Sequence, residues 1–162
     1  MMTAGVALCG LAVLAVPTTA RAGRAAYVDE VLVEKSLRRL TLRGAGRDLK
    51  SYRIWLGKEP VGHKRYQGDN RTPEGVYRID RRNPQSKYYL SLGIDYPRRR
   101  DREIARRHGR PPGGDIFIHG QPNGFRGTIN ADWTAGCVAV KNADMEELFR
   151  FIPLGCPILI VA

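Results

Sequence analysis

Short segments in which apolar and polar residues alternate constrain the fold of this chain more than any other feature. Val31–Glu34 has strand composition, Arg39–Arg43 alternates strictly, and Tyr52–Leu56 and Gly75–Ile79 continue with a period of two. This period puts one face of a strand against the core and the other in water. Gly44–Gly46 predicts a turn. We therefore predict a mostly β fold that begins with a meander of antiparallel strands.

The second half of the chain predicts one further strand and one helix. A charged turn is expected after Ile79, followed by a strand at Tyr88–Leu92. From Asn142 onwards the apolar residues recur at helical spacing, with Asn142 as cap and Pro153 as stop. The residues of this apolar stripe are Met145, Leu148, Phe149 and Ile152.

Arg98–Arg110 interrupts the strand pattern with seven arginines in thirteen residues. Gly109 and the Pro111–Gly114 turn end it, which is typical of a short exposed helix or a lid loop. Two interpretations stay open, a basic rim beside a functional site and a solvated insertion.

The length and the N-terminus predict one exported domain. At 162 residues the chain suffices for a single core. Ala4–Val16 is an uncharged apolar run followed by Ala20-Arg21-Ala22. This pattern predicts a signal peptide over residues 1–22, with an uncleaved membrane anchor as the alternative, although no basic residue precedes the run. Residues 23–162 would then form the mature domain, exported to the periplasm or cell wall.

The net charge of +11 predicts attraction to a polyanion. No recognition helix, zinc spacing or aromatic-glycine RNA motif accompanies the charge, so we do not expect nucleic acid as a partner. An exported protein would meet anionic wall polymer or acidic lipid. A solvated basic surface without a partner is the other interpretation, and the charge does not decide between them.

The cysteines restrict the chemistry. Cys137 and Cys156 would remain after removal of a signal peptide, and such a pair in an oxidising compartment suggests a disulfide. We expect free thiols instead, because a disulfide would consume a candidate nucleophile. Cys156 would then be a structural thiol near a buried terminal strand. No ligand spacing for a metal occurs, and we expect neither a metal nor another cofactor.

Cys137 and His119 form a candidate nucleophile and base. Ile116–Gly120 is a short apolar strand ending at His119, and Gly120 would let the chain turn close to a ligand. Cys137 follows Gly136, which allows close approach of a reacting carbonyl. A thiol attacks as thiolate, and an imidazole can take its proton. A lone cysteine is otherwise more often a small buried apolar residue.

Three segments surround this pair in order: Gly68–Tyr77 with a Gly-Asp-x-x-Thr-Pro pattern, Ile118–Gly120, and Thr134–Val138. Together they resemble the motifs of the L,D-transpeptidases, the YkuD-like domain, which remodel bacterial peptidoglycan. Ile118–Gly120 and Thr134–Val138 are similar to the active-site motif of that family, and Gly68–Tyr77 is similar to its upstream segment. Ile152–Ile158 resembles its closing turn and strand. The resemblance covers Val31–Val161. Ala135 and Ala139 depart from the commonest form, in which His, and Arg or Asn, stand there.

The resemblance implies a β-sandwich with a few short helices and a cysteine L,D-transpeptidase. Cys137 would attack a peptidoglycan stem peptide at the bond between an L-centre and a D-residue, with His119 as the base and the Gly120 carbonyl orienting the ring. The thioester would pass to another stem, to a wall-linked lipoprotein or to water. An L,D-hydrolase and a non-catalytic wall-binding module are the alternatives. We expect a monomer.

The remaining site residues have two interpretations each. Backbone amides of Gly136 and Cys137 would meet the oxyanion. Trp133 would form an apolar wall under the substrate or pack within the protein. Thr134 would hydrogen-bond its own loop or the stem peptide.

Two charged residues near the motifs have predicted roles. Arg71 would bind a stem carboxylate or form a surface ion pair with Asp69 or Glu74. Asp132 is expected to hold its loop rather than to act as a third catalytic residue.

Overall fold

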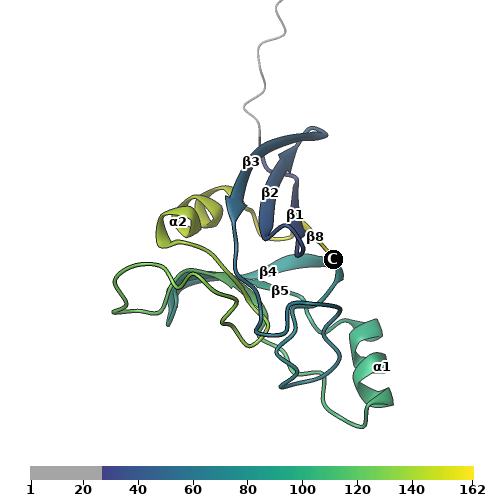
Figure 1. Cartoon of the computed structure of the whole chain (residues 1–162). Helices are drawn as coiled ribbons and strands as arrows, with labels where there is room; N and C mark the ends of the chain where they lie inside the picture. Colours follow the sequence, from purple (N-terminus) through teal and green to yellow (C-terminus); the bar gives the residue numbers. More distant parts are fainter. Residues whose placement is uncertain (1–26) are drawn as a thin grey trace, which may run out of the picture.

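The computed structural model describes residues 27–162 (Figure 1). The predicted signal peptide or anchor at residues 1–22 therefore lies outside the described residues. The strands and helices follow in this order: β1 Glu30–Glu34, β2 Arg39–Gly44, β3 Arg47–Arg53, β4 Gly75–Ser86, β5 Tyr89–Ile94, α1 Arg99–Arg107, β6 Phe117–His119, β7 Val138–Ala139, α2 Asn142–Phe151 and β8 Pro157–Val161.

The strands form a mixed sheet of eight in the order β3-β2-β1-β8-β4-β5-β6-β7. The pairs β1–β8 and β6–β7 are parallel and the other pairs are antiparallel. The C-terminal strand β8 thus lies in the middle of the sheet. The predicted mostly β fold with a few short helices is confirmed, as is the antiparallel pairing of the first three strands.

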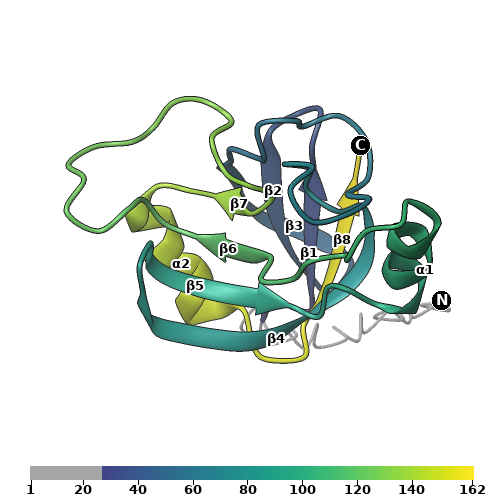
Figure 2. The same ribbon diagram turned by 90° about the horizontal axis from the view of Figure 1, so that it is seen from below.

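Strand β4 joins two halves of the sheet. Its first residues, Gly75–Arg78, pair with β8, and the stretch from Ile79 to Ser86 pairs with β5. Figure 2 shows strands β4 to β6 running across the direction of β1, β2 and β8. The core lies between these halves and α2. Its fully buried members include Val31, Val33, Leu40, Ile54, Leu92, Met145, Leu148 and Ile158.

Two of the predicted strand boundaries were wrong. The charged turn predicted after Ile79 is strand, because the β4–β5 pairing continues to Ser86↔Tyr89. Asp80 and Arg81 are exposed, while Arg82 donates to the Ile152 carbonyl at 2.7 Å. Strand β3 ends at Arg53, before the predicted Leu56. Trp55 instead forms an isolated antiparallel bridge with Ala139, which ties the first half of the sheet to β7.

Helix α2 covers the predicted segment and ends before Pro153, but its cap differs from the prediction. Lys141 is the N-cap and makes no side-chain capping bond. The Asn142 side chain is used elsewhere, because its Oδ1 accepts the Gln121 amide at 2.7 Å.

The arginine-rich segment forms helix α1, one of the two forms predicted for it, at one end of the molecule (Figure 1). Its Asp101 is buried and accepts hydrogen bonds from the Tyr77 hydroxyl at 3.0 Å and the Arg98 amide at 2.8 Å. This carboxylate fastens a helix that is otherwise largely exposed. Neither described helix has the length and apolarity needed to cross a membrane.

Candidate active site

Parallel pairing of β6 and β7 brings the two candidate catalytic segments together. His119 pairs with Ala139, and the Val140 amide donates to the His119 carbonyl at 2.9 Å. Cys137 directly precedes β7, and the register puts it beside Phe117, two residues before His119. The lining of the cavity at Cys137 does not include His119. Segments eighteen residues apart in sequence are thus neighbours in the sheet.

The His119 ring is buried and fixed. Its side chain contacts the Gly120 carbonyl, with 2.7 Å between Nδ1 and the oxygen. A carbonyl only accepts hydrogen bonds, so Nδ1 carries the hydrogen and Nε2 is the basic nitrogen. Burial lowers the pKa of His119, and the bond to Gly120 opposes this in part. The uncharged ring is therefore favoured at neutral pH.

Aromatic rings surround this imidazole. The ring centroids of Tyr88 and His119 are 4.6 Å apart, and those of Trp133 and His119 are 5.5 Å apart. Trp133 thus packs within the protein, as one of its two interpretations predicted, while its half-buried ring stays beside the site. Among the described residues its indole Nε1 is buried without a hydrogen-bond partner.

The Cys137 thiol is half-buried and lines a cavity of about 370 Å³. Its Sγ lies 3.5 Å from the Asp115 carbonyl oxygen. Burial raises the pKa of the Cys137 thiol, while a backbone hydrogen bond from Phe117 and the positive charge of Lys64 lower it. A neutral thiol is therefore the resting form at neutral pH, and attack requires a base.

Position 136 has a conformation and surroundings that only glycine fits. Its φ is +132°, and a Cβ there would come within 2.6 Å of the Arg71 carbonyl oxygen. The Gly136 amide donates to the Thr134 hydroxyl at 3.1 Å, so an oxyanion would have to share or displace this bond. The oxyanion roles of Gly136 and Cys137 remain predictions.

Thr134 is buried and its hydroxyl is used inside its own loop. The hydroxyl donates to the Cys137 carbonyl at 2.8 Å in addition to accepting the Gly136 amide. Of its two interpretations, the structure shows the loop contact. A stem peptide would have to break these bonds to reach the hydroxyl.

The space beside Gly120 is occupied by the protein, contrary to the expectation that a ligand would approach there. A Cβ on Gly120 would lie 2.5 Å from Asn142 Oδ1 and 2.9 Å from Tyr89 Cβ. Glycine is required here because the chain packs closely against α2 and β5. This packing fixes the Gly120 carbonyl that accepts the hydrogen bond from the His119 ring.

Arg71 does not form either of the ion pairs considered for it. Asp69 pairs with Lys64 and Glu74 pairs with Lys35, each at 2.8 Å. The Arg71 guanidinium donates to the Val61 carbonyl at 2.5 Å and is absent from the lining of the Cys137 cavity. Its predicted role in binding a carboxylate stays a prediction.

Asp132 holds the loop that precedes the cysteine motif. Asp132 accepts two hydrogen bonds from Arg38, at 2.7 Å and 2.9 Å, and one from the Leu56 amide at 2.8 Å. The prediction that it holds its loop is confirmed. Asp115 is exposed and its carboxylate pairs with Arg81 at 3.2 Å.

Cys156 is buried directly before β8, as predicted for a structural thiol, and burial raises its pKa to about 11. Within residues 27–162 no group of three or more His, Cys, Asp or Glu side chains is arranged to hold a metal ion. No residue of α1 lines the Cys137 cavity, although Gly113–Asp115 behind that helix do. This favours a solvated α1 over a lid.

Sequence reasoning missed Tyr88 and Lys64. Tyr88 reaches His119 because the β4–β5 turn bends back over β6, where the Gly120 amide donates to the Tyr88 carbonyl at 3.0 Å. Lys64 is buried and lines the Cys137 cavity. Neither residue belongs to a local pattern that would have indicated it.

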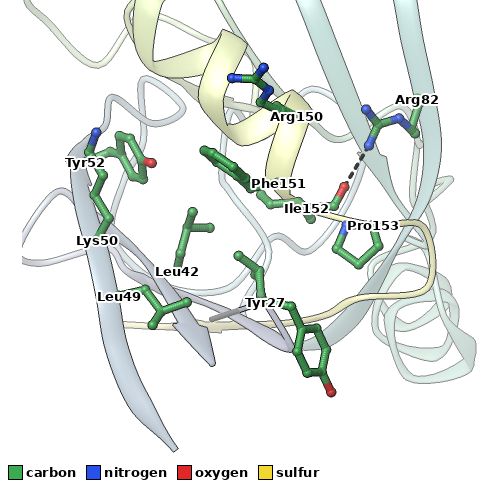
Figure 3. A pocket seen from close by; sticks show the side chains of 11 residues that line it. Tyr27, Leu42, Leu49, Lys50, Tyr52, Arg82, Arg150, Phe151, Ile152 and Pro153 are labelled. Atoms are coloured by element: carbon green, nitrogen blue, oxygen red, sulfur yellow. Dashed lines mark hydrogen bonds between the residues drawn. The ribbon is translucent and has the colours of Figure 1, made fainter. Parts of the chain in front are cut away.

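A larger apolar cavity of about 620 Å³ lies between β2, β3 and the end of α2. Figure 3 shows Leu42, Tyr52 and Phe151 among its lining side chains. The cavity contains no thiol or imidazole. The large cavity therefore offers no group for covalent catalysis. The candidate active site is at the smaller cavity that Cys137 lines.

The fold and the site together define a mostly β domain with an oriented histidine at the end of β6 and a cysteine directly before the neighbouring strand β7. The family model "YkuD: L,D-transpeptidase catalytic domain" matches residues 29–160. This chain belongs to that family. The resemblance of its motifs is thereby confirmed.

Individual relatives agree with the family. A protein of Escherichia coli K12 named "Putative L,D-transpeptidase YafK" is 33% identical over 106 residues, which are 64% of this chain and 37% of the relative. The chain therefore spans little more than a third of the length of that relative.

Solved structures are similar over most of the described chain. The helical cell shape determining protein Pgp2 of Campylobacter jejuni has a TM-score of 0.66 and 26% identity, over 82% of this chain and 47% of that one. Bd1075 of Bdellovibrio bacteriovorus has a TM-score of 0.60 and 27% identity, over 85% and 49% of the two chains. An L,D-transpeptidase of Xylanimonas cellulosilytica, at a TM-score of 0.55 and 16% identity over 86% and 63%, shares the fold.

Proposed function

We propose that this protein is a cysteine L,D-transpeptidase that acts on peptidoglycan stem peptides through a thioester. The observation that supports this most is the orientation of His119. Its Nδ1 is held by the Gly120 carbonyl at 2.7 Å, while Cys137 directly precedes the adjacent strand β7. A histidine oriented in this way needs no acidic side chain as a third member, because the carbonyl sets the tautomer.

The proposed reaction uses the thiol and imidazole as neutral partners. His119 Nε2 takes the proton of Cys137 while Sγ bonds to the carbonyl carbon of the donor stem. The bond from that carbon to the leaving D-residue nitrogen then breaks, and His119 returns the proton to the amine. An acceptor amine next attacks the thioester and releases the thiol. The raised pKa of Cys137 and the lowered pKa of His119 both support general-base attack rather than a standing ion pair.

Main-chain amides would donate hydrogen bonds to the oxyanion that forms in the transition state. We assign this role to the amides of Cys137 and Gly136, each contributing roughly 3 kcal/mol if it reaches the oxyanion. The Gly136 amide can contribute only by sharing its hydrogen with Thr134. Trp133 would form the apolar wall beside the reacting stem, next to His119.

The compartment and partners follow from the same proposal. We propose that the protein is exported to the periplasm or cell wall and acts there as a monomer. A second stem or a wall-linked lipoprotein would supply the acceptor amine. The net charge of +11 supports attraction to anionic wall polymer.

Covalent trapping tests the proposed nucleophile. We expect a carbapenem or iodoacetamide to add to Cys137, detected by intact mass and peptide mapping. The adduct should be lost in Cys137→Ala and should form more slowly in His119→Ala. Cys156→Ala is the matched control and should label as the native protein does, because that thiol is buried. An unreactive Cys137 at neutral pH would favour the non-catalytic wall-binding module.

A second experiment separates transfer from hydrolysis. The protein is incubated with purified stem peptides and an added D-amino acid, and the products are identified by mass. Exchange of the terminal D-residue is the expected outcome. Cleavage without exchange would replace the transpeptidase by the L,D-hydrolase.

A further inference from the structure

The cavity at Cys137 has a single buried cation in its wall, Lys64. Much of the remaining lining is glycine or alanine, which leaves backbone rather than long side chains facing the space. The lining residues are Lys64, Gln67, Gly68, Gly113, Gly114, Asp115, Ile116, Ala135 and Cys137.

The Lys64 ammonium is fixed by two hydrogen bonds, but one of its three hydrogens has no acceptor among the described residues. Its Nζ donates to Asp69 Oδ1 at 2.8 Å and to the Tyr66 carbonyl at 3.1 Å. The ammonium has three hydrogens. Among residues 27–162 no third acceptor contacts it, so one hydrogen remains for a ligand in the cavity.

Asp69 does not cancel the charge that Lys64 presents. Its carboxylate also accepts the amides of Arg65 at 2.6 Å, Tyr66 at 3.2 Å and Arg71 at 3.1 Å. These donors add positive dipole ends around the anion, so the group as a whole attracts negative charge. Asp69 does not line the cavity, and the one acidic residue that does, Asp115, is 82% exposed at its side chain and pairs with Arg81.

We propose that Lys64 makes this cavity a subsite for a carboxylate of the stem peptide close to the bond that Cys137 attacks. This inference rests on the proposed function and adds a property of the substrate to it. A volume of about 370 Å³ between glycine walls suits a small group with an anionic end. Lys64 would thus bind the stem carboxylate that the sequence assigns to Arg71. The Arg71 guanidinium donates to the Val61 carbonyl instead.

Two alkylating reagents that differ in charge test the subsite without any peptide. Iodoacetate is an anion and iodoacetamide is its neutral analogue, and both react with the same thiolate. Their rate ratio at Cys137, divided by the ratio at free cysteine, therefore reports the attraction of the cavity for a carboxylate. Thiolate population cancels from this ratio.

We expect the normalised ratio to be about fivefold or more at low salt, and to fall towards one as salt is added. It should also fall to about one in Lys64→Met, and in the double variant Lys64→Met with Asp69→Asn, which leaves no unpaired carboxylate. Lys64→Arg should retain most of the preference. Lys35→Met is the matched control, because Lys35 is also buried and paired but does not line the cavity.

The outcomes separate the two proposals. Equal normalised rates in the native protein, or an unchanged ratio in folded Lys64→Met, overturn the carboxylate subsite and leave the nucleophile intact. Failure of both reagents to modify Cys137 overturns the proposed function and the subsite with it. Circular dichroism confirms that each variant is folded.

A peptide arm identifies the source of the carboxylate. Stem peptides with a free or amidated C-terminal D-residue are compared, and so are peptides whose side-chain carboxylates are amidated. We expect one of these amidations to raise KM several-fold in the native protein and to have no effect in Lys64→Met. If neither amidation changes KM, the subsite does not serve the substrate and the inference fails.

Discussion

At the scale of single residues, burial acts in opposite directions on the two reacting groups. It raises the pKa of the Cys137 thiol and lowers that of the His119 imidazole. Both shifts favour the uncharged forms. The thiol and the imidazole are therefore neutral before a substrate binds, and they do not form an ion pair. The proton instead moves when a substrate arrives.

We predict that His119 makes stability fall with acidification. The unfolded state takes up a proton below its usual pKa of 6.5, whereas the folded state resists it. Stability is therefore full above that pH and is lost as the pH falls towards the folded-state pKa, by at most about 1.4 kcal/mol per pH unit. Urea unfolding at pH 7.5 and 5.5 should show a smaller loss in His119→Gln than in the native protein. Equal losses would contradict the prediction.

Gly136→Ala should destabilise the protein and slow alkylation of Cys137. The backbone conformation alone costs about 1–3 kcal/mol for a residue with a Cβ, and the contact with the Arg71 carbonyl adds to this. Urea unfolding and the rate of iodoacetamide labelling measure the two effects. Gly124→Ala is the control, because its φ is +81° but its Cβ would meet nothing within 4 Å. Similar losses in both variants would exclude the steric explanation.

At the scale of elements, the loop that carries Cys137 is held by residues far away in the sequence. Arg38 lies in the turn between β1 and β2 and adopts a φ of +49°. Its guanidinium binds Asp132, which also accepts the Leu56 amide. The short strand β7 is thus supported from both sides, by β6 and by the Trp55 bridge.

Asp132→Ala should loosen this loop. Loss of the carboxylate leaves the Leu56 amide without its acceptor and costs about 1–3 kcal/mol. Urea unfolding measures the loss, and hydrogen exchange should accelerate at the Leu56 amide. Glu103→Ala on the exposed face of α1 is the control, with an expected cost of about 0.5 kcal/mol or less for its Arg99 pair. Unchanged exchange at Leu56 would show that the loop does not depend on Asp132.

At the scale of the whole molecule, β8 connects β1 to β4, the strand that joins the two halves of the sheet. It pairs with β1 on one side and β4 on the other, and Ile158 and Ile160 are buried in the common core. Packing of these side chains therefore affects both halves together. The candidate site lies at one end of the strand order, at β6 and β7.

We predict that Ile158→Ala lowers the free energy of unfolding by about 2–5 kcal/mol, because it opens a cavity in the shared core. Val161→Ala in the same strand should cost less than about 1 kcal/mol, since that side chain is 36% exposed. Urea unfolding followed by tryptophan fluorescence and by circular dichroism should give coincident transitions for both variants. Separate transitions would show that the halves unfold independently.

Several features were predictable from the sequence because they depend on neighbours along the chain. The early strands, helix α2 and the Cys137 and His119 motifs follow from periodicity and from local residue order. The charged half of β4 was not predictable, because its strand conformation comes from pairing with β5. Tyr88 and Lys64 were missed for the same reason, since their contacts with His119 and the Cys137 cavity arise from long-range register.

The sequence by itself determined the early strands, helix α2 and the chemical groups that the site contains, since these depend on local residue order. Only the tertiary structure decided how each polar group is used. It assigned the Thr134 hydroxyl to its own loop, Arg71 to the Val61 carbonyl and Asn142 to the Gln121 amide. Hydrogen-bond partners such as Arg38 and Asp132 stand 94 residues apart, so no local pattern can specify them.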